Sequence, residues 1–220
     1  ISYELDVPLT SHGPYYINLN AREQDKIDSS VERIIQTAKI SDLCGAESMT
    51  FHAAFYMKDS PFDVFDLVEK SLNVIEERLN RLDIEIELRP ELTGKTSQFG
   101  SLEELIALAK SVGSCRPCMD FSHLYARTGK YNTYEEFNEV LQTLSKELGR
   151  DALDNMHIHI SGVSSNSKGD LKHLNLEKSD FNWKDLIRSL KDNNCKGYMI
   201  SNSPNLEDDA IMLKNFYHSY

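Results

Sequence analysis

The sequence has few cysteines and no long apolar run, and these two absences exclude several classes of protein. Only 4 of its 220 residues are cysteine, too few for the disulfide framework of a small secreted domain. No apolar stretch approaches the roughly 20 residues that a membrane-spanning helix needs, and the first residues do not form a signal peptide. We therefore expect a soluble, cytoplasmic protein without a membrane partner.

Motifs for nucleotide and redox cofactors are also missing. The sequence contains no GxGxxG, and Gly94-Lys95-Thr96 is not the end of a P-loop, because Arg89 stands where the first glycine is required. Cys115 and Cys118 have CxxC spacing, but a zinc ribbon needs a second pair. A thioredoxin-like motif would open a helix, whereas this one continues as an apolar strand. We interpret both thiols as buried and reduced.

Basic residues are in deficit. The chain has 24 Lys and Arg against 35 Asp and Glu, a net charge of −11. Phosphate binding is usually driven by clusters of Lys and Arg, so this balance disfavours a nucleic-acid partner. It is not decisive, because bound divalent cations are often the largest local charges in a site.

Strand and helix patterns alternate along the chain. Short runs of branched, aromatic and sulfur-bearing residues predict strands at 7–12, 48–53, 84–89, 116–121, 156–161 and 197–201. Helical patterns lie between or after them at 25–43, 61–82, 102–112, 133–148, 183–192 and 207–216. This alternation indicates parallel βαβ units. We predict an α/β fold with one β/α barrel domain over residues 1–220, because an open nucleotide-binding sheet would carry a glycine-rich first turn.

Five of the seven histidines fall where a strand pattern breaks into a loop, and acidic residues share those breaks. Imidazole and carboxylate groups are ligands of zinc and other borderline divalent metals. Barrel enzymes gather their catalytic residues at the carboxyl ends of the strands. The sequence therefore predicts a polynuclear metal site at the mouth of the barrel. The candidate residues are His12, His52, Glu91, Asp120, His123, His157, Asp170 and His173.

Two of these positions have rivals. Glu91 follows Pro90, which cannot continue a central strand, but Glu87 within the strand pattern is an alternative ligand. His157 and His159 lie on the same face of one predicted strand by its period of two, and the alternation does not separate them. Asp120 and His123 make the sharpest pair, because an aspartate at the end of a buried strand needs a charge partner and a metal would supply it.

Six segments carry candidate ligands and their neighbours, in this order along the chain: Ser11–Leu19, Phe51-His52, Arg89–Lys95, Cys118–His123, His157–His159 and Gly169-Asp170 through His173. Together they resemble the endonuclease IV family. This is apurinic/apyrimidinic endonuclease family 2, whose fold is a xylose-isomerase-like TIM barrel. The resemblance implies an eight-stranded barrel, of which this sequence would lack the first two strand–helix units.

The resemblance implies a cluster of two or three zinc ions, with manganese as the alternative metal. His12, His52 and Glu91 would hold the first ion. Glu91 would also bridge to a second ion, held by Asp120 and His157, and these three would be the catalytic residues. The third ion would be held by His123, Asp170 and His173.

Two further positions carry over from the family. Tyr15 and Tyr16 match the loop that enters the minor groove of DNA at an abasic site. At the last strand the family has a glutamate that completes the middle zinc site, whereas Asn202 stands here. An amide oxygen is a weaker ligand than a carboxylate. We therefore expect the middle metal to be held less tightly, with low activity as one outcome.

The implied activity is that of a hydrolase in DNA base excision repair. It would cleave the phosphodiester bond 5′ to an abasic site in duplex DNA, and also remove 3′-blocking groups, with the protein acting as a monomer. One alternative is a sugar or sugar-phosphate isomerase or epimerase of the same barrel superfamily. Another is a low-activity, metal-binding paralogue, since Asn202 replaces the expected glutamate.

Overall fold

The computed structural model describes Glu4 and residues 7–220, and for Asp170 and Leu171 it describes the backbone alone. The chain forms two compact units. Unit 1 consists of Ile1–Glu91 and Ser97–Pro117, and unit 2 consists of Leu92–Thr96 and Cys118–Tyr220. That residues 1–220 make a single barrel domain stays a prediction.

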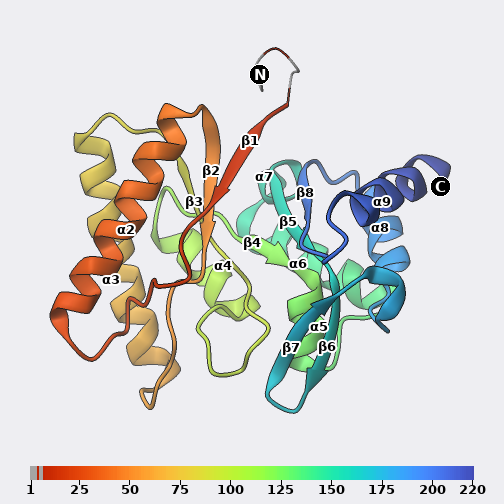
Figure 1. Ribbon diagram of the computed structural model, residues 1–220, viewed down its shortest axis with the longest axis horizontal. Helices are drawn as coiled ribbons and strands as arrows, with labels where there is room; N and C mark the ends of the chain where they lie inside the picture. The colour runs from red at the N-terminus through yellow and green to blue at the C-terminus, as the bar shows by residue number, and fades with distance from the viewer. Residues whose placement is uncertain (1–3, 5–6) are drawn as a thin grey trace. The chain divides into compact units, whose positions relative to one another are not determined.

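Unit 1 is a parallel three-stranded sheet with helices following its strands. Strands β1 (Leu9–His12), β2 (Ala46–Phe51) and β3 (Glu87–Pro90) lie side by side in that order (Figure 1). His12 is in register with Thr50, and Phe51 with Pro90. The three strands therefore end at the same edge of the sheet. The helices are α2 (Gln24–Leu43), α3 (Pro61–Arg81) and α4 (Leu102–Ser111).

The helices of unit 1 begin and pack as their sequences require. Ser60 accepts a hydrogen bond from the Asp63 backbone and Pro61 occupies the first turn, so α3 starts at a fixed residue. Ser101 and Glu104 form a capping box at the start of α4. Buried apolar residues recur every three or four positions along α3 and join the core of unit 1. They are Val64, Val68, Leu72, Ile75 and Leu79.

Unit 2 contains a second parallel sheet. Strands β4 (Cys118–Asp120), β5 (Met156–Ile160) and β8 (Gly197–Ser201) lie in that order, with Asp120 in register with His159. Phe137 packs edge to face against both Phe121 and Phe181, with ring centroids 6.0 Å apart in both pairs. The helical segments are α5 (Phe121–Thr128), α6 (Tyr134–Leu148), α7 (Asp151–Asp154), η1 (Leu176–Lys178), α8 (Trp183–Asp192) and α9 (Glu207–Ser219).

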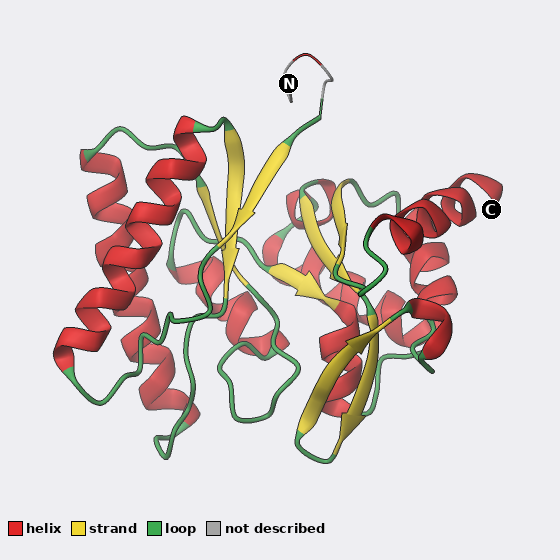
Figure 2. Ribbon diagram, viewed as in Figure 1, coloured by secondary structure: helices red, strands yellow, loops and turns green. Residues whose placement is uncertain are grey.

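An antiparallel hairpin follows β5 in unit 2. Strands β6 (Gly162–Asn166) and β7 (Gly169–Leu174) form it, and it stands out as a long two-stranded ribbon (Figure 2). A Cβ at Gly162 would lie 2.4 Å from the Asn175 carbonyl oxygen, so glycine permits this close approach at the base of the hairpin.

All six predicted strands and all six predicted helices are present, within a few residues of their expected bounds. The sequence did not reveal the hairpin, so the expected total of six strands was too low. Asp170 and His173 lie within β7 rather than in a loop after a strand, and His123 lies in α5 rather than in a turn. None of the helices in the described part of the chain is long and apolar enough to cross a bilayer.

Candidate metal centre

The ends of the three strands of unit 1 bring His12, His52 and Glu91 together. His12 is the last residue of β1, His52 follows β2, and Glu91 follows β3. The Glu91 backbone N–H donates to the Phe51 carbonyl at 3.0 Å, which extends the ladder by one residue. One ligand atom from each of the three side chains lies within 4.8 Å of the others. We call His12, His52 and Glu91 the first donor set.

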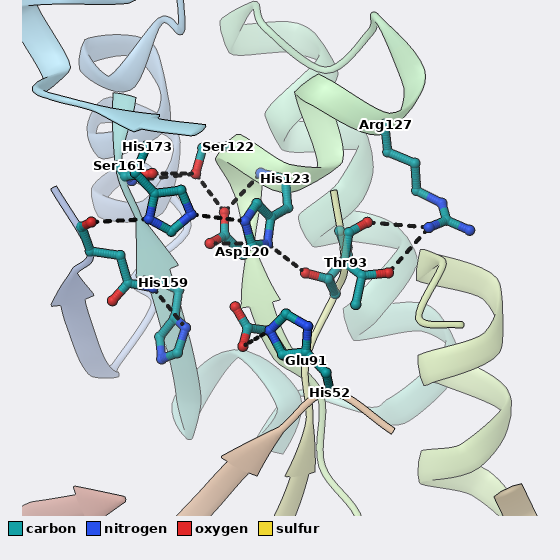
Figure 3. A network of polar contacts seen from close by, with 12 residues as sticks. His52, Glu91, Thr93, Asp120, Ser122, His123, Arg127, His159, Ser161 and His173 are labelled. Atoms are coloured by element: carbon teal, nitrogen blue, oxygen red, sulfur yellow. Dashed lines mark hydrogen bonds and ion pairs between the residues drawn. The ribbon is translucent and has the colours of Figure 1, made fainter. Parts of the chain in front are cut away.

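Both imidazoles of the first donor set meet one carboxylate oxygen. Nε2 of His12 and Nε2 of His52 each lie 3.1 Å from Oε2 of Glu91. The Glu91 side chain is only 2% exposed, while those of His12 and His52 are 30% and 20% exposed. The set thus combines a buried carboxylate with two imidazoles that solvent reaches, and Figure 3 shows His52 against Glu91.

The tautomer of His12 shows what this geometry requires. Its Nδ1 lies 2.6 Å from the Gly13 carbonyl oxygen, which can only accept, so Nδ1 carries a proton. In the neutral ring Nε2 then presents a lone pair to Glu91 Oε2, which is also an acceptor. These atoms attract each other only with a cation between them, either a second ring proton or a metal ion. The arrangement fits a metal ligand whose second nitrogen is fixed by a backbone carbonyl.

Glu87, the alternative to Glu91 as a ligand, pairs with a buried arginine instead. It lies in β3 four residues before Glu91, and its Oε2 accepts a hydrogen bond from Nε of Arg89 at 3.0 Å. The Arg89 side chain is 2% exposed, so this ion pair neutralises a buried guanidinium. The structure therefore brings Glu91, and not Glu87, to His12 and His52.

The tyrosines predicted to contact DNA lie in the loop after β1. Tyr15 and Tyr16 are 79% and 81% exposed. The Tyr15 ring contacts both histidines of the first donor set, with centroids 5.5 Å from His12 and 6.0 Å from His52. An exposed aromatic surface therefore adjoins these imidazoles.

In unit 2, Asp120 and His123 are joined by a helix cap. Asp120 ends β4 and caps α5, and its Oδ1 accepts from the His123 backbone at 2.8 Å and from Ser122 Oγ at 2.5 Å. Its Oδ2 is buried and accepts no hydrogen bond from the residues that the structure describes, although Nδ1 of His123 lies 3.3 Å away. A buried carboxylate oxygen in this state is what a cation would satisfy.

His123 and His173 face each other through their Nε2 atoms, which lie 3.2 Å apart. Nδ1 of His123 lies 3.0 Å from the Leu92 carbonyl, and Nδ1 of His173 lies 3.1 Å from the Asn202 carbonyl. Both carbonyls require a proton on Nδ1, so the two neutral rings point lone pairs at each other. As in unit 1, a shared proton or a metal ion resolves this conflict. Figure 3 shows the line of contacts from Asp120 through His123 to His173.

We call Asp120, His123 and His173 the second donor set. Asp170, the predicted partner of His173, lies in β7, but its side chain is outside what the structure describes. That Asp170 is a ligand, and that Glu91 also bridges to a metal held by Asp120, therefore stay predictions.

His157 and His159 are both buried on β5, but their neighbours differ. His157 is in register with Cys118, whereas His159 is in register with Asp120 at the end of β4. Nδ2 of Asn202 lies 3.2 Å from Nδ1 of His159. The residue that departs from the family pattern thus contacts His159, the histidine that was the alternative to the predicted His157.

Sequence reasoning missed two residues that belong to these surroundings. Ser122 donates to Asp120, and its place between Asp120 and His123 could have suggested this role. Cys118 was interpreted only as a buried, reduced thiol. It is indeed buried and reduced, but it forms a donor group with His157 and His159. Only the register of β4 against β5 reveals that grouping.

A family model described as a xylose isomerase-like TIM barrel matches residues 2–215. The chain belongs to this family. Its fold is therefore the xylose isomerase-like TIM barrel that the sequence predicted. Two solved structures of similar fold are a D-tagatose 3-epimerase-like protein, at TM-score 0.73 and 16% identity, and endonuclease IV from Thermus thermophilus, at TM-score 0.71 and 22% identity. The first match covers 100% of this chain and 79% of the epimerase-like protein. The second covers 98% of this chain and 77% of the endonuclease.

Relatives by sequence include an uncharacterized protein and distant endonucleases. An uncharacterized protein of Methanocaldococcus jannaschii is 40% identical over 98% of this chain and 79% of its own length. A probable endonuclease 4 of Aster yellows witches'-broom phytoplasma is 25% identical over 82% of this chain. The match spans 62% of that endonuclease, which is less than two thirds of its length. The family is thus established, with distant endonuclease 4 relatives.

Proposed function

We propose that this chain belongs to a metal-dependent phosphodiesterase of the endonuclease IV type. The substrate would be duplex DNA with an abasic site, cleaved at the bond 5′ to that site, and 3′-blocking groups would be removed in the same way. The observation that carries the proposal is the first donor set, where two imidazoles meet one buried carboxylate beside an exposed tyrosine. The distant endonuclease 4 relatives support it.

The donor sets suit divalent zinc, with manganese as the alternative. His12, His52 and Glu91 would hold one ion, and Asp120, His123 and His173 another. When bound, a divalent metal polarises a phosphoryl oxygen and makes water a stronger nucleophile near neutral pH. The metal charges would also offset the acidity of the chain, whose net charge is −11.

The residues of the chain would orient ligands and substrate. The Gly13 carbonyl holds the proton on Nδ1 of His12, and the Leu92 and Asn202 carbonyls do the same for His123 and His173. These histidines are then ligands and not general bases. The exposed Tyr15 ring would stack on the unpaired region of the duplex, where a base is missing and unstacking costs least.

One observation favours a second candidate, a sugar or sugar-phosphate isomerase or epimerase. Asn202 presents an amide where the endonuclease IV pattern has a carboxylate, and its Nδ2 contacts His159. An amide beside a metal site can hydrogen bond to a hydroxylated substrate. The third candidate, a metal-binding paralogue of low activity, would follow from the same substitution.

The decisive experiment is cleavage of a duplex that carries one tetrahydrofuran abasic analogue. The protein is assayed after loading with Zn²⁺ or Mn²⁺ and after prior chelation. We expect incision only at the analogue, lost on chelation and restored by metal. Glu91→Gln should abolish incision while Glu87→Gln retains it. No incision by fully loaded protein would reject the nuclease, and turnover of a ketose in the same preparation would then favour the isomerase.

A further inference from the structure

Cys118, His157 and His159 lie together inside unit 2. Cys118 is in register with His157 on the neighbouring strand, and residues two apart on a strand share a face. One donor atom from each of the three lies within 4.8 Å of the others. We call these residues the third donor set.

The third donor set is a group of polar side chains buried within the sheet of unit 2. The exposed fractions of Cys118, His157 and His159 are 0%, 0% and 3%. The alternate residues of β5 are the buried Ile158 and Ile160, so only one face of the strand carries imidazoles. Placing two imidazoles and a thiol together in the interior costs more free energy than filling the same space with apolar side chains.

The chemistry of the set favours a borderline metal ion. A thiolate with two imidazoles is a donor combination that zinc accepts, and three protein ligands leave a fourth position for a further ligand. Carboxylates would instead favour harder cations. The third donor set thus differs in kind from the first, which contains no sulfur.

Asn202 acts here as a positioning residue. Its amide lies 3.2 Å from Nδ1 of His159 and can present either Oδ1 or Nδ2 to that nitrogen. With Oδ1 toward the ring, Nδ1 would donate its proton to the amide, and Nε2 of His159 would keep a lone pair for the ion. Ligand histidines are commonly oriented in this way by their second nitrogen.

We propose that Cys118, His157 and His159 form a buried thiolate–imidazole site for zinc or a similar borderline divalent cation. The Cys118 thiol releases its proton to solvent when the ion binds, and the sulfur becomes a ligand. The ion would then be held by sulfur and nitrogen, without the carboxylates that the first and second donor sets contain. This inference deepens the proposed function but rests on it only for the presence of metal in unit 2.

Cobalt is the probe for the test, because a thiolate ligand gives Co²⁺ a near-ultraviolet charge-transfer absorption that nitrogen and oxygen ligands do not. The protein is loaded with Co²⁺ alone, and the absorption is compared in wild type, Cys118→Ser and Cys115→Ser. Cys115 is the matched control, since it is also fully buried and lies outside the metal-donor groups found among the described residues. We expect the absorption in wild type and Cys115→Ser and its loss in Cys118→Ser, with about one fewer cobalt bound.

A second variant guards against misfolding. His157→Gln leaves the thiol in place and should also remove the absorption, while circular dichroism confirms that each variant is folded. Absorption that persists in Cys118→Ser, or that is absent from wild type, overturns the proposal. If the cobalt protein lacks the absorption yet incises the abasic duplex, the inference fails and the proposed function stands. Absorption without incision supports the site and counts against the nuclease.

Discussion

The first and second donor sets contain similar groups but are built in different ways. The first takes one residue from the end of each of three neighbouring parallel strands, β1, β2 and β3. The second takes Asp120 from a strand end, His123 from the first turn of α5 and His173 from a hairpin. The first set therefore needs only the parallel sheet, whereas the second needs a helix and a hairpin in correct position. This comparison predicts where each set is fragile.

The largest expected effect is the loss of metal from the first donor set in Glu91→Gln. The change keeps the shape of the side chain but removes the charge that both imidazoles face. Loss of a group that merely orients a ligand costs about ten to a hundredfold in affinity, so loss of this ligand should cost at least about a hundredfold. Titration with Zn²⁺ followed by calorimetry measures it.

Glu87→Gln is the matched control for that variant. It disturbs the pair with Arg89 and should lower the melting temperature, but zinc affinity should stay unchanged. If Glu87→Gln loses the metal and Glu91→Gln does not, the assignment of the first donor set is reversed.

Next in size is Asp120→Asn, which separates the two roles of this residue. Asparagine caps a helix about as well as aspartate, so α5 should keep its start and the free energy of unfolding should change by less than about 1 kcal/mol. Zinc affinity of the second donor set should fall about a hundredfold, because an amide oxygen replaces the carboxylate ligand. Chemical denaturation and metal titration of one preparation give both values. A large fall in stability with unchanged affinity would mean that Asp120 serves the helix alone.

A smaller effect is expected for Ser122→Ala. The Ser122 hydroxyl donates to Oδ1 of Asp120, which leaves Oδ2 for a cation, so its loss should weaken zinc binding about tenfold. Ser189→Ala is the control, because Ser189 is equally buried and bonds to Asn138 in another part of unit 2. Both variants should lose similar stability, and only Ser122→Ala should lose metal affinity. Equal zinc affinities in the two variants would remove Ser122 from the site.

The smallest effect concerns Asp209, which holds the segment after the hairpin. Burial alone would raise the pKa of Asp209, but hydrogen bonds from the Asn205 side chain and the Leu176 backbone help to lower it below its ordinary value. A lowered pKa in the folded state means that the carboxylate stabilises the fold above its unfolded pKa of about 3.9. This contribution is lost as the pH falls through the lower, folded value.

Asp209→Asn should therefore cost about 1 kcal/mol at neutral pH, and its difference from wild type should shrink below about pH 4. Denaturation across this pH range measures the difference. Because η1 follows β7, which carries His173, Asp209→Asn should alter zinc affinity at the second donor set but not at the first. A difference that is independent of pH would show that the charge of Asp209 does not matter.

Much of the fold and of the first donor set could be predicted from the sequence. His12, His52 and Glu91 each follow a short apolar run, and parallel strands place such residues at one edge of a sheet. The hairpin could not be predicted in this way. Its strands carry polar residues such as Ser164, Ser165 and Lys172. The strands are therefore held by backbone pairing and show no apolar face that a sequence pattern could reveal.

The sequence by itself determined the alternation of strands and helices, the family, and the donor types at the strand ends, because these follow from local periodicity and residue chemistry. Only the tertiary structure showed that Glu91, and not Glu87, lies against His12 and His52, and which partners His157 and His159 meet. Period two puts both histidines on one face, and the register with β4 then sets one opposite Cys118 and the other opposite Asp120. Register depends on long-range backbone pairing, which no local pattern specifies.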